Sequence, residues 1–315
     1  MSVSRPGGRE GGGVRGATAR VLGQAKLNLF LHILARERSG YHQIETLLVR
    51  VDLADTVVIR TAVRGRSLDV AGVEVPAGGL GPVERNLAWR AALAYVEVTG
   101  WPEHFAIELT KRIPVGGGLG GGSADAGAVL RGLDALNPAS PLGQVQLLAV
   151  AASLGADVPF LTSASATALA WGRGERMLAV QPPLSPRAVW LLVPPFGVAT
   201  VEAYGWVAAS RGDGGRVSSS RVLSAGDLAH WPAVAVLAHN DFEADVARRH
   251  PLIGALVDAL RRQGAIIAQV SGSGSTVFGV FAREGQGPAA DMVSAGVRLV
   301  RTRTSAHVEE VEVSE

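Results

Sequence analysis

A glycine-rich run in the first half of the chain offers backbone amides to an anion. Six of the seven residues from Gly116 to Gly122 are glycine, and the stretch from Ser123 to Leu136 has apolar residues at helical spacing. Glycine loses more backbone freedom on folding than any other residue, so such a run implies a close backbone approach to a ligand. The free N–H groups and the dipole of a helix N-terminus favour phosphate. The run therefore predicts a nucleotide-phosphate site, with a flexible linker as the alternative.

The run matches neither of two familiar phosphate-binding patterns. A Walker A loop places lysine directly after its second glycine, and no lysine lies inside this run. A dinucleotide fingerprint needs an acidic residue about 20 residues further on, and the stretch from Asn137 to Leu147 contains none. The loop is therefore of another type.

Charged residues elsewhere suit proton and phosphoryl chemistry. Asp157 lies before Val158 and Pro159, in a turn where a fixed carboxylate can accept a proton from a substrate hydroxyl. Local hydrogen bonding within the turn is the alternative. Lysine occurs only at Lys26 and Lys111, whereas the other 28 of the 30 basic residues are arginine. We interpret these two positions as sites that require the compact ammonium group of lysine. The alternative is that lysine occurs there by chance.

Two further turns have the composition of ligand contacts. Ser39-Gly40-Tyr41-His42 presents two rings side by side, which suits recognition of a flat ring. A plain surface turn is the alternative for this segment. The turn from Ser271 to Ser275 alternates serine with glycine, and it is either a hairpin turn or a second backbone nest near substrate or phosphate.

The elements around these motifs predict an α+β protein. Alternation from Ala25 to Leu34 predicts a strand that places Lys26 and Asn28 on the same face, opposite a leucine face. Further strands are predicted at 43–53, 55–61, 105–109, 164–170, 188–193, 266–270, 276–281 and 307–313, with a hairpin arm at 66–75. Helices are predicted at 86–99, 123–136, 142–154, 252–262 and 289–300. We expect a disordered tail at 1–18, an N-terminal domain at 19–163 and a C-terminal domain at 164–315.

Composition narrows the class of protein. The 315 residues are 47% hydrophobic and 18% charged, as in a globular protein with a sizeable core. A net charge of +2 gives no support for a nucleic-acid partner. The absence of cysteine excludes disulfides and thiolate chemistry, and the seven histidines lack metal-ligand spacing. No apolar run approaches the roughly 20 residues of a membrane span, and the N-terminal residues lack the apolar core of a signal peptide. A cytoplasmic location is therefore expected.

These motifs occur together, and in the same order, in one known family. The chain resembles the GHMP kinase superfamily from residue 22 to residue 300, through Ala25-Lys26-Leu27-Asn28-Leu29-Phe30-Leu31, Ser39-Gly40-Tyr41-His42, Pro114-Val115-Gly116-Gly117-Gly118-Leu119-Gly120-Gly121-Gly122-Ser123, Gly155-Ala156-Asp157-Val158-Pro159 and Ser271-Gly272-Ser273-Gly274. The resemblance implies a two-domain α+β fold. The N-terminal domain would be like the second domain of ribosomal protein S5, the C-terminal domain would be ferredoxin-like, and the site would lie in the cleft between them.

The resemblance also implies an ATP-dependent kinase that acts on a small cytidylyl sugar alcohol. Asp157 would be the general base, and Lys26 would offset charge during phosphoryl transfer. Asn28, Tyr41 and His42 would recognise the cytidine end, and Tyr204 would stack on cytosine. Contacts with ATP would come from Asn86, Lys111, Pro114, Val115, Gly116, Gly117, Gly118, Leu119, Gly120, Gly121, Gly122, Ser123 and Ala124. In this type of loop backbone amides bind the phosphates, and Ser123 is the candidate protein ligand of Mg²⁺.

The chain departs from the family pattern at two positions, and two other functions compete. Gln24 stands where proline is usual, and Ser39 where aspartate is usual. A GHMP kinase for homoserine, mevalonate or a sugar is one rival, against which the ring pair of Tyr41 and His42 argues. An S5-like RNA-binding protein is the other, against which the small net charge argues. We expect no nucleic-acid or membrane partner, and a monomer or homodimer.

Overall fold

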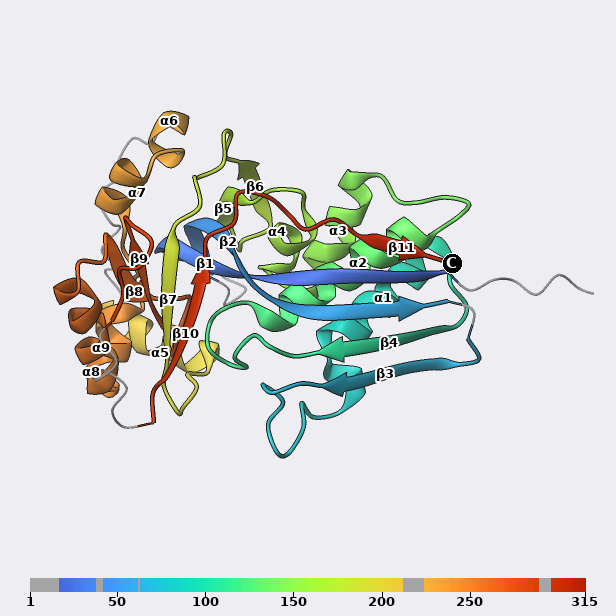
Figure 1. Ribbon diagram of the computed structural model, residues 1–315, viewed down its shortest axis with the longest axis horizontal. Coiled ribbons are helices and arrows are strands. Elements are labelled where there is room, and N and C mark those ends of the chain that lie inside the picture. The colour runs from blue at the N-terminus through green and yellow to red at the C-terminus, as the bar shows by residue number, and fades with distance from the viewer. Residues whose placement is uncertain (1–16, 38–41, 62, 212–223, 289–295) are drawn as a thin grey trace, which may run out of the picture.

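Two β-sheets with helices packed on them make up the protein (Figure 1). The computed structural model describes residues 17–37, 42–61, 63–211, 224–288 and 296–315. The expected tail at 1–18 lies outside these residues except for Ala17 and Thr18, and Thr18 already begins the first strand.

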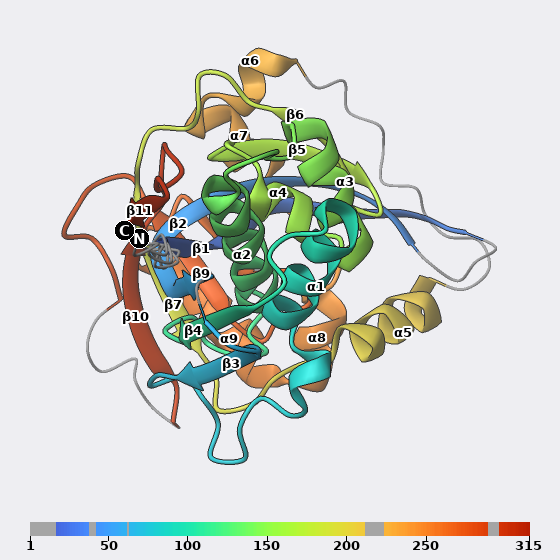
Figure 2. The same ribbon diagram turned by 90° about the vertical axis from the view of Figure 1, so that its right-hand side faces the viewer.

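The first sheet is built around two long antiparallel strands, β1 and β2. Its order is β11-β1-β2-β4-β3, and β5 and β6 extend it from the other part of β2. Its strands are β1 (Thr18–Arg36), β2 (His42–Arg60), β3 (Arg66–Ala71), β4 (Phe105–Thr110), β5 (Thr167–Gly172), β6 (Arg176–Ala179) and β11 (Glu312–Ser314). Figure 2 shows β11 beside the start of β1, with which it pairs.

Two strand predictions in this sheet were wrong. The strands predicted at 43–53 and 55–61 form the single strand β2. Asp55 is fully buried within this strand and accepts the N–H groups of Arg112 and Ile113, so its polar side chain does not interrupt β2. The predicted hairpin arm contains β3, which pairs in parallel with β4 and so belongs to no hairpin with it.

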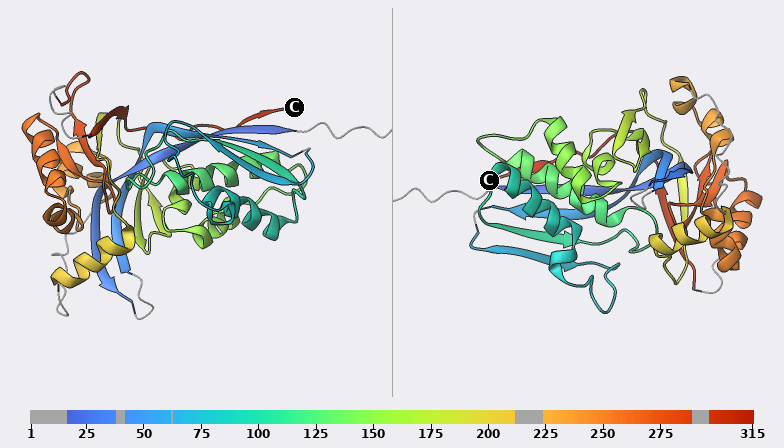
Figure 3. Two further views of the ribbon diagram at one scale, coloured as in Figure 1. Left: turned by 90° about the horizontal axis from the view of Figure 1, so that it is seen from below. Right: turned by 180° about the vertical axis from the view of Figure 1, so that it is seen from behind.

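Helices cover one face of the first sheet (Figure 3, left). They are the 3-10 helix η1 (Val83–Arg85), α1 (Leu87–Thr99), α2 (Gly121–Leu136), α3 (Gln144–Leu154) and α4 (Val158–Thr162). The apolar face of α2, including Val129 and Leu133, packs with Val21 and Ile59 in a continuous core. α2 begins at Gly121, two residues before the predicted Ser123, so the last glycines of the run are helical.

The second sheet has the antiparallel order β10-β7-β9-β8. Its strands are β7 (Ala188–Val193), β8 (Ile267–Val270), β9 (Val277–Phe281) and β10 (Arg298–Arg303). Its helices are α5 (Thr200–Arg211), α6 (Ala225–Leu228), α7 (Trp231–Leu237), α8 (Glu243–Arg249) and α9 (Pro251–Arg262). Numbered within this sheet, the strand order is 4-1-3-2, which confirms the ferredoxin-like prediction.

Three boundaries differ from the sequence expectation. The strand predicted at 307–313 is β11, which begins only at Glu312. The predicted helix at 289–300 is wrong at its end, because residues 298–300 lie in β10, and residues 289–295 are outside the described part. β5 and β6 follow the expected domain boundary at 163/164 yet pair into the first sheet. By sheet membership, the change from the first unit to the second falls after Ala179, and β11 returns to the first.

Candidate active site

A cleft of about 1390 Å³ lies where elements of both sheets meet. Most of the sequence motifs contribute to its wall. Residues that line it include Lys26, Asn28, His42, Gly118, Gly120, Asp157, Tyr204, Gly272 and Ser273.

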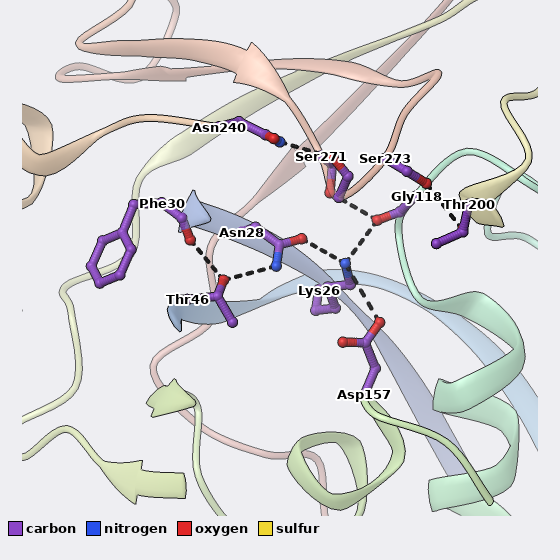
Figure 4. A network of polar contacts seen from close by, with 11 residues as sticks. Lys26, Asn28, Phe30, Thr46, Gly118, Asp157, Thr200, Asn240, Ser271 and Ser273 are labelled. Carbon is purple, nitrogen blue, oxygen red and sulfur yellow. Dashed lines mark hydrogen bonds and ion pairs between the residues drawn. The ribbon is translucent and has the colours of Figure 1, made fainter. Parts of the chain in front are cut away.

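Lys26 occupies the floor of this cleft. The pairing of β1 with β2 shifts between Gln24 and Lys26, an irregularity of the kind that redirects a side chain beside a functional site. The Lys26 ammonium donates to Asn28 Oδ1 at 2.6 Å and to the Gly118 carbonyl at 2.9 Å. The ammonium also lies 3.6 Å from Asp157 Oδ2 (Figure 4). Lys26 is 3% exposed, so these oxygens replace the water that burial removes.

Asp157 stands directly before α4 with its carboxylate toward Lys26 (Figure 4). It occupies the N-cap position, yet its side chain makes no capping hydrogen bond. The side chain is 34% exposed, and among the described residues its carboxylate forms an ion pair with the Lys26 ammonium. The alternative of a turn aspartate engaged in local hydrogen bonds is therefore not what the structure shows. The carboxylate can receive a proton from a ligand in the cleft.

The glycine run is pressed against the serine-rich turn of the second sheet. Gly116, Gly118 and Gly120 have φ of 74°, 77° and 72°, which favours glycine. A Cβ on Gly118 would lie 2.1 Å from the Ser271 carbonyl oxygen, so close packing also excludes a side chain there. The run is thus a packed, defined loop, and the flexible-linker alternative is wrong.

The loop leads into the N-terminus of α2, where unpaired amides face outward. The first helical hydrogen bond joins the Ala124 N–H to the Gly120 carbonyl, so the amides of Gly121, Gly122 and Ser123 precede it. Gly122 is exposed and Ser123 half-buried, whereas Ala124 is buried. This end of the helix therefore offers N–H groups to an anion.

The turn from Ser271 to Ser275 closes the cleft above Lys26. The Ser271 hydroxyl donates to the Gly118 carbonyl oxygen at 2.9 Å. The same carbonyl oxygen also accepts a hydrogen bond from the Lys26 ammonium. Asn240 donates to the carbonyls of Val270 and Gly272 at 2.7 and 2.8 Å. The turn does join β8 to β9 as a hairpin, and it also forms part of the site.

One wall of the cleft carries stacked rings. His42 and Tyr204 stack with centroids 4.5 Å apart and planes 12° apart, and Phe242 meets Tyr204 edge-on at 4.9 Å. Burial raises the pKa of Tyr204 to about 12. Tyr41, the predicted partner of His42 in ring recognition, lies outside the described residues. Among the described residues, the tertiary structure brings His42 together with Tyr204.

Asn28 is engaged by protein groups at both ends of its amide. Its oxygen binds Lys26, its nitrogen donates to Thr46 Oγ1 at 2.9 Å, and Thr46 donates to the Phe30 carbonyl at 2.6 Å (Figure 4). Asn28 is 2% exposed, so the role that the structure shows is to orient the Lys26 ammonium. Contact between Asn28 and a substrate stays a prediction.

Lys111 lies beneath the glycine loop between two buried carboxylates. Its ammonium binds Asp55 and also Asp125, the latter at 2.6 Å. Burial raises the pKa of Asp125 to about 8, against the opposing effect of Lys111. Lys111 is 2% exposed and its ammonium is committed to these carboxylates, so it supports the loop from below. Its expected contact with ATP stays a prediction.

The remaining predicted ATP residues lie around the loop. Asn86 is the N-cap of α1, where its side chain accepts the Ala88 N–H at 2.9 Å. Pro114, Val115 and Gly117 line a second cavity of about 330 Å³. Their contacts with a nucleotide stay predictions.

Sequence reasoning missed several residues that organise the site. Asn240 holds the serine-rich turn, and Thr46 holds Asn28. Thr200 at the start of α5 shares a 3.1 Å hydrogen bond with Ser273. Thr46 lies within β2 and Thr200 begins α5, and threonine is common at both kinds of position, so no local signal distinguished these residues.

Comparisons with known proteins point to one family. The GHMP kinases N terminal domain matches residues 86–166, and the GHMP kinases C terminal domain matches residues 224–294. The 4-diphosphocytidyl-2-C-methyl-D-erythritol kinase of Shouchella clausii is 35% identical over 263 residues, 82% of this chain and 84% of its own. That of Gloeobacter violaceus is 38% identical over 286 residues, 89% of this chain and 91% of its own.

Solved structures agree with this grouping. A crystal structure of 4-(cytidine 5'-diphospho)-2C-methyl-D-erythritol kinase aligns with a TM-score of 0.69 and 33% identity, covering 90% of this chain and 98% of that one. The homoserine kinase of Cytophaga hutchinsonii aligns with a TM-score of 0.65 at 16% identity, covering 98% and 100%, which shows a shared fold alone. Within the described part of the chain, every helix is too short or too polar to span a bilayer.

Proposed function

Because the chain belongs to the GHMP kinase family, and within it to the 4-diphosphocytidyl-2-C-methyl-D-erythritol kinases, we propose that Asp157 is the general base of its phosphoryl transfer. ATP is the donor, and the acceptor is the 2-hydroxyl of 4-diphosphocytidyl-2-C-methyl-D-erythritol in the non-mevalonate isoprenoid pathway. As the hydroxyl oxygen bonds to the γ-phosphorus, its proton passes to Asp157. The bond from the γ-phosphorus to the β-γ bridging oxygen breaks, and ADP leaves.

The pairing of Asp157 with Lys26 in one cleft carries this proposal. The carboxylate is partly exposed and makes no capping bond, whereas the ammonium is buried and held by two further oxygens. An acceptor hydroxyl bound to Asp157 therefore lies beside a fixed positive charge. That charge stabilises negative charge that develops on the reacting oxygens, without reorganising during the reaction.

The glycine loop supports the placement of ATP. Its packed backbone and the free amides at the start of α2 suit the phosphates. Near these amides, Ser123 offers one hydroxyl as a ligand for Mg²⁺. Phosphate oxygens and water would supply the rest of the coordination shell. When bound there, Mg²⁺ would neutralise phosphate charge.

The ring wall supports recognition of the cytidine end. His42 and Tyr204, stacked on each other, line the same cleft as Asp157, and aromatic side chains stack on nucleobases. A homoserine kinase has no base to recognise, so this wall favours the cytidylyl substrate over that rival. A cytoplasmic location, a monomeric or homodimeric state and the absence of a nucleic-acid partner stay predictions.

Turnover by an Asp157→Asn variant tests the proposed base. We expect kcat to fall by about 100- to 10,000-fold, the usual contribution of general-base catalysis, with ATP binding nearly unchanged. Asp69→Asn is the matched control, because Asp69 is exposed on β3 and does not line the cleft. Full activity in Asp157→Asn would place the base elsewhere. Homoserine turnover without turnover of the cytidylyl substrate would overturn the substrate assignment.

A further inference from the structure

Helix α5 is attached to the rest of the molecule at both of its ends. At its start, Thr200 shares a hydrogen bond with Ser273 of the serine-rich turn. At its end, Arg211 donates through NH1 to the Ile33 carbonyl at 2.6 Å and through NH2 pairs with Asp241 at 2.7 Å. The helix therefore connects the serine-rich turn of the second sheet with β1 of the first.

Asp241 completes a closed set of contacts at that end. One carboxylate oxygen binds Arg211 and also accepts the N–H of Ile33, while the other lies 2.9 Å from His239 Nε2. Burial by itself would raise the pKa of Asp241, but the hydrogen bonds from His239, Ile33 and Arg211 hold it at about 2. We call Arg211 and Asp241, with the backbone of Ile33 that both bind, the α5 clasp.

The clasp and the ring wall lie along the same helix face. Tyr204 and Arg211 are seven residues apart, about two helical turns, and the buried Ala203 and Val207 share that side. Tyr204 reaches His42 at the start of β2, while Arg211 reaches Ile33 on the paired β1. α5 lies beside the end of β1 and the start of β2 (Figure 3, left).

The same cluster contains donor atoms that resemble a metal site. His32, His239 and Asp241 place one ligand atom each within 4.8 Å of the others. Arg211 already binds the carboxylate, and its charge would repel a divalent cation at the same group. The geometry therefore favours a salt-bridged clasp at this place.

We propose that the α5 clasp positions Tyr204 for the cytidine base, by holding α5 against the ends of β1 and β2. Arg211 and Asp241 are then positioning residues for substrate recognition, although neither lines the cleft. This inference rests on the proposed function. Without the clasp, α5 keeps the contacts of Thr200 with Ser273 and of Ser210 with Asp245, but the face of Tyr204 is no longer fixed relative to His42.

Steady-state kinetics of Arg211→Ala test the clasp. We expect KM for the cytidylyl substrate to rise about tenfold, within the range of couplings between residues that share a structural element, while KM for ATP and kcat change less than about twofold. Arg60→Ala is the matched control, because Arg60 pairs with Glu108 on β4, is 43% exposed and does not line the cleft. Arg211→Lys keeps the charge without the two-pronged contact, so an intermediate KM is expected.

A double-mutant cycle separates positioning from general stabilisation. If Arg211 acts through Tyr204, Arg211→Ala leaves KM unchanged in a Tyr204→Ala background, and thermal unfolding identifies any variant that misfolds. An equal rise of KM in both backgrounds, or no rise in Arg211→Ala alone, would overturn the inference while the proposed function stands. A wild-type protein that does not phosphorylate the cytidylyl substrate would overturn both.

Discussion

Replacing Lys26 by methionine removes the ammonium group from the floor of the cleft and keeps an unbranched side chain. Methionine fills irregular space well, and the Lys26 stem already packs against the glycine loop, where a Cβ on Gly120 would lie 3.0 Å from Lys26 Cγ. The Gly118 carbonyl retains the Ser271 hydroxyl as a donor, so the loop stays attached to the serine-rich turn. The substitution therefore removes mainly the positive charge beside Asp157.

The distance from the Lys26 ammonium to Asp157 gives the scale of the effect, because an acceptor hydroxyl bound to Asp157 would develop negative charge at a similar distance from the ammonium. At 3.6 Å, unit charges interact by about 1 kcal/mol in bulk water and by about 5 kcal/mol at an effective dielectric of about 20. Asp157 is 34% exposed, so the site lies between these limits. Only charge that develops in the transition state counts toward catalysis. We therefore expect a loss of about 2 to 3 kcal/mol, which is a fall in kcat of about 30- to 160-fold.

The assay varies ATP and the cytidylyl substrate separately and records thermal unfolding alongside. Lys26→Met should lower kcat while leaving KM for ATP within about threefold, because the loop keeps its other contacts. Lys26→Arg should also be impaired. A Cβ on Gly120 would lie 3.0 Å from Lys26 Cγ, so the stem is packed against the loop backbone, and a larger planar guanidinium would not reproduce the position of the compact ammonium.

Two results would refute this reasoning. A kcat for Lys26→Met within about threefold of the wild type would mean that the ammonium contributes little to the transition state. A normal kcat combined with a greatly raised KM for ATP would assign Lys26 to support of the glycine loop instead. Lost activity accompanied by a lower unfolding temperature would point to misfolding, and Lys26→Gln would then separate charge from packing.

Three other substitutions test the remaining parts of the site. Lys111→Met should lower the free energy of unfolding by about 3 to 5 kcal/mol in urea titrations, because it leaves two buried carboxylates without their cation; a loss below about 1 kcal/mol would contradict this. Gly118→Ala should reduce kcat/KM for ATP at least about tenfold, since its Cβ meets Ser271 and φ is positive, whereas Gly143→Ala, with open space around it, should be neutral. Equal effects of the two alanines would argue against a packed loop. Tyr204→Ala should raise KM for the cytidylyl substrate about tenfold, in keeping with base stacking, and an unchanged KM would remove Tyr204 from recognition.

Local patterns in the sequence predicted the framework of the site. Period-2 alternation placed Lys26 and Asn28 on one strand face, and the structure joins them by a 2.6 Å hydrogen bond. The glycine run predicted a loop before a helix, because no other residue tolerates its positive φ angles so readily. The strand order of the second sheet followed the family resemblance. These features depend on residues close together in the chain or on a recognisable motif.

Contacts between distant segments were decided by tertiary structure. Composition alone singles out both lysines, and the fold shows which oxygens each ammonium contacts. Lys26 faces a partly exposed carboxylate in a cleft, whereas Lys111 is enclosed by two buried ones. The ring partner of His42 is likewise Tyr204 from the other half of the chain. Burial and charge pairing depend on which remote segments pack together, and chain-local spacing carries no information about that.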